Sequence, residues 1–370
     1  MHLISSEPFP APTYSGEGPS LSGDGVQRTA ILAGSQVKRP AALLIAVSPL
    51  DIREFLPGSL LEEVRTLALN YKEFDPATSS AAEFVALVQE FNPEIIVSGW
   101  KTPALPTKLP SGLRYVCHLT GTVRELLTRK HLEDGLLATN WGSSISRVVA
   151  EGALYHILSC LRRGTHWTLA MHREGAWKTR EAETSSLFGR RVGIHGFGRV
   201  ARELVELLAP FKTNISVLAP DLDTALARSC GVHRSASLEA LFLENDIIVE
   251  LAPLNAETEG CITEKHLRLL RPGSVFVNTG RGRVVDDEGL VRVAREGQVS
   301  FGLDVFAEEP LPANHPLRGL ANVSLTPHQS GPTTDRRSDA GAHSLGNLQA
   351  YAAGQPLQSL ITPELYDISS

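Results

Sequence analysis

The sequence contains little that would support a metal-binding or disulfide-stabilised fold. Only four cysteines occur among its 370 residues, Cys117, Cys160, Cys230 and Cys261, and no two of them form a C-x-x-C pair. Scattered cysteines of this kind are typical of free thiols in a reducing compartment and do not favour structural zinc. We therefore expect buried free thiols and no metal site.

Segments that would cross or target a membrane are also lacking. No apolar run approaches the roughly 20 residues needed to span a bilayer. Residues 1–40 do not show the basic-then-apolar pattern of a signal peptide and are rich in Ser, Gly and Pro. The formal net charge of −6 does not favour nucleic acid or an anionic membrane as partner. These features favour a cytoplasmic enzyme with a flexible tail at 1–40, no nucleic-acid partner and no membrane partner.

What the chain does contain is the ordinary composition of a folded protein, with 42% hydrophobic and 21% charged residues. A chain of this length is too long for one core, so two domains are expected. In the first unit, apolar runs at 41–47, 94–97 and 113–117 predict strands, and a helical pattern covers 80–91. Strands that alternate with helices indicate a parallel sheet with right-handed crossovers.

A second alternating unit follows a long helical pattern at 146–163, which we expect to join the two domains. Residues 165–186 are polar and are predicted to be irregular. The expected strands of the second unit are 191–195, 215–219, 246–251, 274–278, 300–304 and 322–326. This pattern predicts an α/β protein with a Rossmann-type doubly wound parallel sheet at 147–334. A smaller, flavodoxin-like substrate domain is expected to combine 41–146 with 335–370.

The first expected strand of the second unit runs into a glycine turn. Gly196 and Gly198 stand where the chain must turn sharply and expose bare backbone, and Ala201 is small enough for close packing of helix on strand. A helix predicted over 198–209 would offer its unpaired N–H groups to a diphosphate. His195 in this turn is expected to fill the strand end rather than to act in catalysis.

Polar residues suited to one chemistry follow three other expected strands. Arg281, Glu309 and His328 each emerge at the carboxyl end of a parallel strand, where open sheets bind ligands. A histidine transfers protons near neutral pH, and an adjacent carboxylate favours its protonated form. A guanidinium grips a carboxylate at two points. The trio predicts hydride transfer between a nicotinamide and a 2-hydroxy acid.

Four segments resemble those of the D-isomer-specific 2-hydroxyacid dehydrogenases of the phosphoglycerate dehydrogenase type. They are the glycine turn at 192–200, the arginine segment at 277–286, the glutamate segment at 303–312 and the histidine segment at 325–328. The likeness covers residues 41–365 and is strong over 147–331. It implies that Arg281 binds the substrate carboxylate and that His328 is the acid/base with Glu309 as its partner. It also implies a homodimer joined through the cofactor domain.

The glycine turn and this resemblance together give a set of expected binding residues. For the cofactor they are Gly196, Gly198, Arg199, Val200, Asp221, Thr279, Gly280, Arg281, Asp304, His328, Ser330 and Gly331; for the small-molecule substrate they are Gly121, Thr122 and Arg281. Dinucleotide folds usually carry an acid about 20 residues beyond the glycines. That position is Ala219, and Asp221 lies two residues later. No arginine follows at once to bind a 2′-phosphate, so NAD is favoured over NADP.

Two other functions remain open at this level. A dinucleotide-sensing corepressor-like protein shares the fold that the resemblance implies, and such binders can keep all three polar residues. A formate dehydrogenase of the same fold is echoed by Ser330 and Gly331, although the glutamate before Pro310 disfavours it. Substrate identity is expected to depend on the loops at 99–106 and 119–124 of the first domain.

Overall fold

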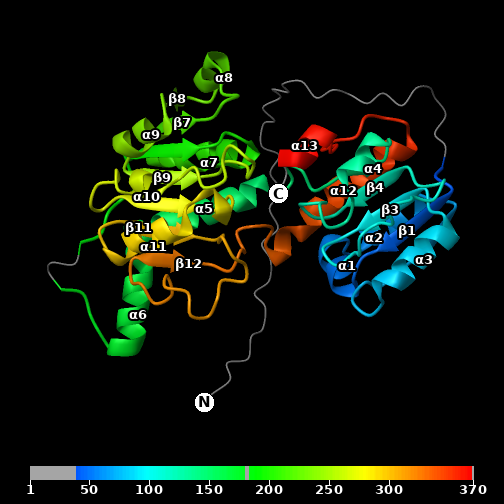
Figure 1. Ribbon diagram of the computed structural model, residues 1–370, viewed down its shortest axis with the longest axis horizontal. Helices are drawn as coiled ribbons and strands as arrows, with labels where there is room; N and C mark the ends of the chain where they lie inside the picture. Colours follow the sequence, from blue (N-terminus) through cyan, green and yellow to red (C-terminus); the bar gives the residue numbers. More distant parts are fainter. Residues whose placement is uncertain (1–38, 180–182, 369–370) are drawn as a thin grey trace.

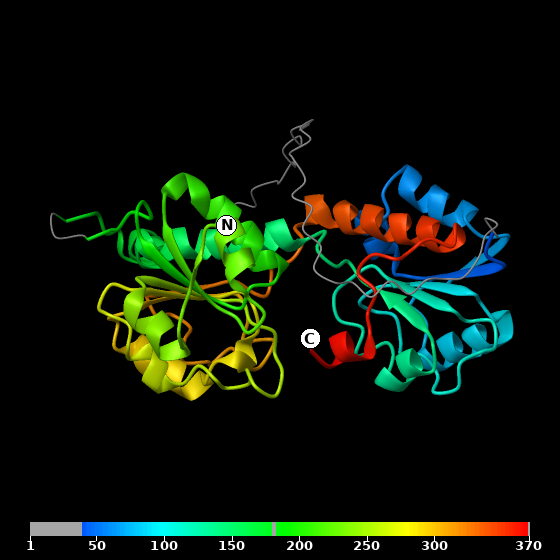
Figure 2. The ribbon, with the colours of Figure 1, turned by 90° about the horizontal axis from the view of Figure 1, so that it is seen from above.

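The computed structural model describes residues 39–179 and 183–368. Two lobes lie side by side, each built around its own parallel sheet with helices on both faces (Figure 1). A view turned by 90° shows the same two lobes joined by short connections (Figure 2). The tail predicted at 1–40 lies outside the described residues except for Arg39 and Pro40.

The first lobe holds a five-stranded sheet in the order β2-β1-β3-β4-β5, with every neighbouring pair parallel. Its strands are β1 (Ala42–Ala46), β2 (Asn70–Glu73), β3 (Ile95–Ser98), β4 (Tyr115–His118) and β5 (Leu137–Thr139). This is the strand order of flavodoxin-like folds, so the predicted architecture of the smaller domain is confirmed.

Helices cover both faces of this sheet, and alternate strand residues point to opposite faces. Leu43 and Ile45 of β1 face one cluster, whereas Leu44 and Ala46 face the other. The first cluster is covered by α1 (Pro49–Phe55), α2 (Ser59–Thr66) and α12 (Arg337–Ala352), and the second by α3 (Ala81–Phe91), α4 (Arg129–Glu133) and α13 (Pro363–Ile368). Helix α12, orange in Figure 1 and late in the sequence, therefore packs with elements from the start of the chain.

The second lobe holds a seven-stranded parallel sheet in the order β12-β11-β10-β9-β6-β7-β8. Its strands are β6 (Arg191–His195), β7 (Asn214–Leu218), β8 (His233–Arg234), β9 (Ile247–Glu250), β10 (Val275–Asn278), β11 (Ser300–Leu303) and β12 (Val323–Leu325). Strand order reverses between β6 and β9, which is the switch point of a doubly wound sheet. The Rossmann-type prediction is confirmed.

Helices cover both faces of this sheet as well. One face packs against α5 (Ser146–Leu161) and α7 (Arg199–Leu208), with α8 (Thr224–Ser229) at its edge; the other packs against α9 (Leu238–Glu244), α10 (Glu264–Leu267) and α11 (Asp287–Arg295). The predicted helices at 146–163 and 198–209 correspond to α5 and α7. The apolar spacing of α7 is strong, whereas that of α5 is weaker because small residues such as Ala150 and Ala153 make up much of its buried face.

The prediction of irregular structure at 165–186 is wrong for its first half. A helix, α6, spans Gly164–Glu174 and ends at Gly175, whose positive φ of 62° closes it. Ala170 is its only buried residue, so the helix carries no apolar stripe that a sequence pattern could show. Strand β2 escaped prediction for a similar reason, because all four of its residues are exposed at the sheet edge.

The four cysteines are free in the structure, as expected. Cys117 and Cys160 are buried, whereas Cys230 and Cys261 are partly accessible, so the prediction of burial is right for two of them. Within the described residues, none of the helices has the length and apolar character required to span a bilayer.

Candidate active site

A cleft of about 1230 Å³ lies between the two lobes, at the carboxyl ends of the strands of the second lobe. The first lobe contributes Trp100, Gly121, Asn140 and Trp141 to its walls. The second lobe contributes the glycine turn, the loop after β10 and the segment after β12, with the residues Gly198, Val200, Leu251, Ala252, Pro253, Thr279, Gly280, Arg281, Asp304, Pro327, His328, Gln329, Ser330 and Gly331. Segments far apart in the sequence therefore meet at one edge of the sheet.

The two glycines of the turn after β6 have different physical roles. Gly196 has a φ of +87°, and a Cβ there would stand 2.7 Å from the backbone N and Cα of Ala252. Gly198 has an ordinary φ of −70°, and a Cβ there would meet no protein atom within 4 Å. The backbone conformation and the contact with Ala252 therefore require glycine at position 196, whereas Gly198 leaves the start of α7 open to the cleft.

The residue before this turn, His195, pairs with an acid on the neighbouring strand. Its Nδ1 lies 2.6 Å from Oε2 of Glu250, whose side chain is fully buried. Burial would lower the pKa of His195, but the hydrogen bond and charge of Glu250 raise it overall. The other carboxylate oxygen of Glu250 accepts the N–H of Ala252 at 2.7 Å. His195 therefore secures the strand end, in agreement with its predicted packing role.

Arg281 follows β10 on a loop held tightly against the next connection. A Cβ on Gly282 would lie 1.9 Å from the carbonyl carbon of Phe306, so only glycine fits between them. Asn278 donates its side-chain N–H to the carbonyl oxygen of Arg281 at 3.0 Å. Burial lowers the pKa of Arg281, and the charge of Glu309 opposes that shift. Nη1 of Arg281 donates to the carbonyl oxygen of Gly280 at 2.7 Å, which positions the guanidinium on the cleft wall.

Glu309 and His328 form a direct pair beside it. Oε2 of Glu309 lies 2.6 Å from Nδ1 of His328, and Oε1 accepts the N–H of Phe306 at 2.9 Å. The hydrogen bond that His328 donates to Glu309 raises the pKa of His328, and this effect exceeds the opposing effect of burial. Burial would raise the pKa of Glu309, but the bonds from His328 and Phe306 hold it below its usual value. The pair favours a protonated imidazole beside a charged carboxylate.

A buried carboxylate holds the segment that carries His328. Asp304 is 1% exposed, and its oxygens accept bonds from the Thr326 hydroxyl at 2.6 Å and from the N–H groups of Gln329 and Ser330 at 2.9 Å each. The N–H of His328 donates to the backbone oxygen of Asp304 at 2.8 Å. These bonds fix His328 at a φ of +50°, a left-handed conformation that is uncommon for a histidine.

Comparison with known proteins gives the same assignment as the motifs. The sequence model of the D-isomer specific 2-hydroxyacid dehydrogenase NAD binding domain matches residues 154–330. A glyoxylate reductase of Aeropyrum pernix is 33% identical over 245 residues, which cover 63% of this chain and 72% of that protein. A D-3-phosphoglycerate dehydrogenase of Methanocaldococcus jannaschii is 28% identical over 230 residues, covering 62% of this chain and 44% of that one.

The chain belongs to the D-isomer specific 2-hydroxyacid dehydrogenase family.

The family predicted from the four motifs is thereby confirmed, together with NAD as cofactor and the general class of NAD-linked 2-hydroxyacid dehydrogenases. Among solved structures, a glyoxylate reductase from Paecilomyes thermophila shares the fold, with a TM-score of 0.73 and 22% sequence identity. The match covers 88% of this chain and 99% of that one. At 22% identity this likeness shows a shared fold and does not identify the substrate.

Two features of the dehydrogenase cleft fit a dinucleotide. Gly198 presents bare backbone where a side chain would otherwise stand, in front of the first N–H groups of α7. The hydroxyl of Thr279 is buried at the cleft without a hydrogen-bond partner. A buried polar atom of this kind is costly unless a ligand completes it. Among the described residues, no group of His, Cys, Asp or Glu is arranged to hold a metal ion.

Most of the predicted binding and catalytic residues line the cleft of this dehydrogenase, but five do not. Those that line it are Gly121, Gly198, Val200, Thr279, Gly280, Arg281, Asp304, His328, Ser330 and Gly331. Gly196 packs against the backbone of Ala252, and Glu309 contacts Nδ1 of His328 without lining the cleft itself. Arg199, Thr122 and Asp221 are exposed and lie outside the lining.

The sequence analysis missed several residues of the first-lobe wall. Asn140 and Trp141 follow β5, a three-residue strand too short to stand out as an apolar run. Arg337 opens α12 and reaches the cleft from the far end of the chain, which no local pattern could indicate. His118, at the end of β4, is buried and does not line the cleft; its ring nitrogens contact the hydroxyls of Ser98 at 2.9 Å and Thr120 at 2.6 Å.

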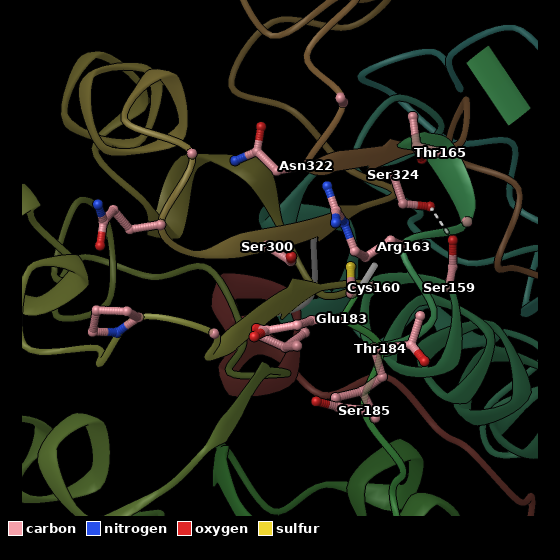
Figure 3. A pocket seen from close by; sticks show the side chains of 18 residues that line it. Ser159, Cys160, Arg163, Thr165, Glu183, Thr184, Ser185, Ser300, Asn322 and Ser324 are labelled. Atoms are coloured by element: carbon pink, nitrogen blue, oxygen red, sulfur yellow. Dashed lines mark hydrogen bonds between the residues drawn. The ribbon is translucent and has the colours of Figure 1, made fainter. Parts of the chain in front are cut away.

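A second cavity, of about 530 Å³, lies at the opposite end of the same sheet. It is lined by the last turn of α5 and by Ser300 and Ser324 near the amino ends of β11 and β12, and Ser159 donates to Ser324 at 3.2 Å (Figure 3). Parallel sheets present their ligand sites at the carboxyl ends of the strands. None of the Arg281, Glu309 and His328 side chains reaches this cavity, so the dehydrogenase site is the cleft between the lobes.

Proposed function

We propose that the protein interconverts a small 2-oxo acid and its 2-hydroxy acid of D configuration, using NAD(H) in the cleft between the lobes. One observation carries this proposal: an imidazole held by a carboxylate at 2.6 Å stands in the same cleft as a positioned guanidinium. Arg281 would bind the substrate carboxylate, His328 would be the acid/base, and Glu309 would hold the imidazole. The first lobe would act as the substrate domain.

In the reducing direction, His328 gives a proton to the oxo oxygen of the substrate. Because Nδ1 is engaged by Glu309, Nε2 is the ring nitrogen that serves this oxygen. Arg281 fixes the substrate by a two-point contact with its carboxylate, which aligns the reacting carbon. NADH supplies the hydride when it is bound. The protonated state that Glu309 favours in His328 is the one that reduction requires.

The cofactor would be held by the open backbone at Gly198 and Val200 and by the unpartnered hydroxyl of Thr279. Asp221 stands in the turn that follows β7 and Ala219, close to where the adenosine ribose is expected in this fold. Its carboxylate would favour the ribose hydroxyls of NAD over the 2′-phosphate of NADP. A lower KM for NADH than for NADPH is expected, and the reverse order would exclude Asp221 from the ribose site.

A homodimer joined through the second lobe is part of the same proposal. Three large apolar side chains between the start of α6 and β6 are exposed: Met171 at 47%, Trp177 at 72% and Phe188 at 65%. Exposed apolar side chains on this lobe are groups that such an interface would cover. Analytical ultracentrifugation should give twice the chain mass at micromolar concentration, and a monomer there would contradict the proposed dimer.

The principal test is the loss of NADH absorbance with glyoxylate, pyruvate, hydroxypyruvate and longer 2-oxo acids. Arg281→Lys should lower kcat/KM about 100-fold, because one charge-assisted hydrogen bond of the fork is lost along with its geometry. Arg283→Lys is a matched control, since Arg283 lies two positions away, pairs with Glu259 and does not line the cleft.

Near-normal turnover of Arg281→Lys would overturn the role assigned to the guanidinium. A parent protein that binds NADH but reduces none of these acids would favour the dinucleotide-sensing function instead. Oxidation of formate with NAD in place of this activity would favour the formate dehydrogenase alternative.

A further inference from the structure

The wall that the first lobe presents to the cleft is aromatic. Trp100 lies two residues beyond β3 and is 46% exposed, although it is a large apolar side chain. Trp141 lies two residues beyond β5. Both tryptophans line the same cleft as Arg281 and His328, and we refer to them together as the aromatic wall. An exposed tryptophan inside a cleft is unusual enough to indicate a ligand contact.

The exposed ring of the wall is held in place by its neighbours. Trp100 packs edge-to-face against Phe55 at 5.3 Å and against Trp141 at 6.1 Å between ring centroids. Its turn is closed by Thr102, whose hydroxyl accepts the N–H of Gly99 at 2.8 Å and donates to the backbone oxygen of Ala46 at 2.5 Å. A ring fixed in advance loses little conformational entropy when a ligand stacks on it.

Trp141 ties the wall to the loop that is expected to face the substrate. The backbone N–H of Trp141 donates to the backbone oxygen of Thr120 at 3.2 Å. A Cβ on Gly121 would stand 2.8 Å from Cζ2 of the indole, so the ring lies directly against this glycine. The neighbouring Asn140 donates to the Gly121 oxygen at 2.8 Å. The indole and the loop backbone therefore form one rigid surface.

The cation beside the wall is already neutralised. The Arg337 guanidinium lies 5.1 Å from the Trp100 ring centroid and 5.9 Å from that of Phe55. Its Nη1 is ion-paired with Glu54, which is mostly buried. Arg337 therefore stiffens the aromatic cluster by cation–π contact with its charge paired to Glu54, although its Nε is a buried donor without a hydrogen-bond partner. The wall favours an uncharged, apolar substituent.

We propose that the aromatic wall binds the side chain of the substrate, and that this side chain is an aryl or similarly large apolar group attached at C3 of the 2-oxo acid. The inference rests on the proposed function, since it assumes that Arg281 and His328 hold the 2-oxo carboxylate end. Glyoxylate has no side chain and would leave the indoles in water. An aryl group would cover the exposed face of Trp100 and gain stacking as well as burial.

The test compares phenylpyruvate, glyoxylate and 2-oxoglutarate as substrates of the full chain with NADH. We expect kcat/KM to be at least about tenfold higher for phenylpyruvate than for the other two. Trp100→Ala should lower the value for phenylpyruvate about tenfold and the value for glyoxylate less than about threefold, whereas Trp100→Phe should restore most of the loss. Tyr71→Ala is the matched control, because Tyr71 is an exposed aromatic of β2 outside the cleft lining.

Calorimetric titration of phenylpyruvate into the complex with NAD⁺ separates the two proposals. Binding that Trp100→Ala weakens, without turnover of any acid by the parent, would support the aromatic wall and overturn the proposed function. Turnover that is fastest with glyoxylate and unchanged by Trp100→Ala would overturn the aromatic wall alone. Highest activity with 2-oxoglutarate would also overturn it, because it would make Arg337 a receptor for a second carboxylate. The aromatic wall would also be overturned if phenylpyruvate were neither bound nor turned over.

Discussion

His156 gives the most direct physical test of the site's supporting structure. This histidine of α5 is fully buried, and its Nε2 lies 2.8 Å from the hydroxyl of Thr326, which in turn donates to Asp304 at 2.6 Å. Its Nδ1 is buried without a hydrogen-bond partner. Burial lowers the pKa of His156 to about 4, against a partial opposing effect of the Asp304 charge. The ring is therefore held neutral beneath the segment that carries His328.

The pH dependence follows from the lowered pKa. The unfolded chain takes up a proton on this ring near pH 6.5, whereas the folded chain resists it down to a pKa of about 4. Between these values the unfolded state binds more protons, so the free energy of unfolding falls as the pH falls. At pH 5 the contribution of this one ring is a loss of about 2 kcal/mol, and at pH 7 it is close to zero.

Replacing the ring should therefore remove part of the acid sensitivity. His156→Leu loses one hydrogen bond but also removes a buried unpartnered nitrogen, so its free energy of unfolding at pH 7 should lie within about 1 kcal/mol of the parent. From pH 7 to pH 5, the variant should lose about 2 kcal/mol less than the parent does. Urea unfolding at both pH values, followed by circular dichroism, measures the difference.

A matched control guards this prediction against a general effect of losing a histidine. His172 of α6 is exposed, so its ring is in water in both states, and His172→Leu should keep the acid sensitivity of the parent. If His156→Leu and the parent lose the same free energy between pH 7 and pH 5, the ring is not the neutral, desolvated group described above.

Two further predictions concern the site itself. Reduction of a 2-oxo acid needs a protonated His328, so kcat/KM should fall as the pH rises through the pKa of His328, which Glu309 raises. Glu309→Gln should move this fall to lower pH. An unmoved pH profile would contradict the pairing of the two residues. Gly198→Ala should leave the urea midpoint unchanged and weaken NADH binding about tenfold, whereas Gly196→Ala should lower the midpoint because its Cβ would meet the Ala252 backbone. Equal urea midpoints for the two glycine variants would contradict the different roles assigned to Gly196 and Gly198.

Much of the second lobe was predictable because its functional residues directly follow the parallel strands. Arg281, Glu309 and His328 each come after a short apolar strand, and the carboxyl ends of parallel strands share one edge of a sheet. The glycine turn was predictable because strand, turn and helix follow one another within 190–209. Local pattern and global topology agree there, so each expected strand from 191 onward matches an observed one within one or two residues at each end.

The first-lobe wall shows why the rest could not be predicted. Trp141 follows β5, whose three residues give no period. The return of 335–370 to this lobe was predicted, but the contact of Arg337 with Trp100 was not, because it depends on how α12 packs. The pairing of His195 with Glu250 is likewise invisible in the sequence, because it depends on β6 lying next to β9. Such contacts depend on which side chains meet when strands and helices pack, and local sequence patterns do not show this.

Asp304 shows how one residue can be placed correctly and yet do more than its motif implies. The resemblance predicted that Asp304 binds the cofactor, and Asp304 does line the cleft. Its carboxylate, however, already accepts three hydrogen bonds from the segment that carries His328. A left-handed histidine costs about 1–3 kcal/mol of backbone strain, and several bonds to one buried carboxylate can offset that cost. The geometry of the imidazole therefore depends on Asp304 even if no ligand touches the carboxylate.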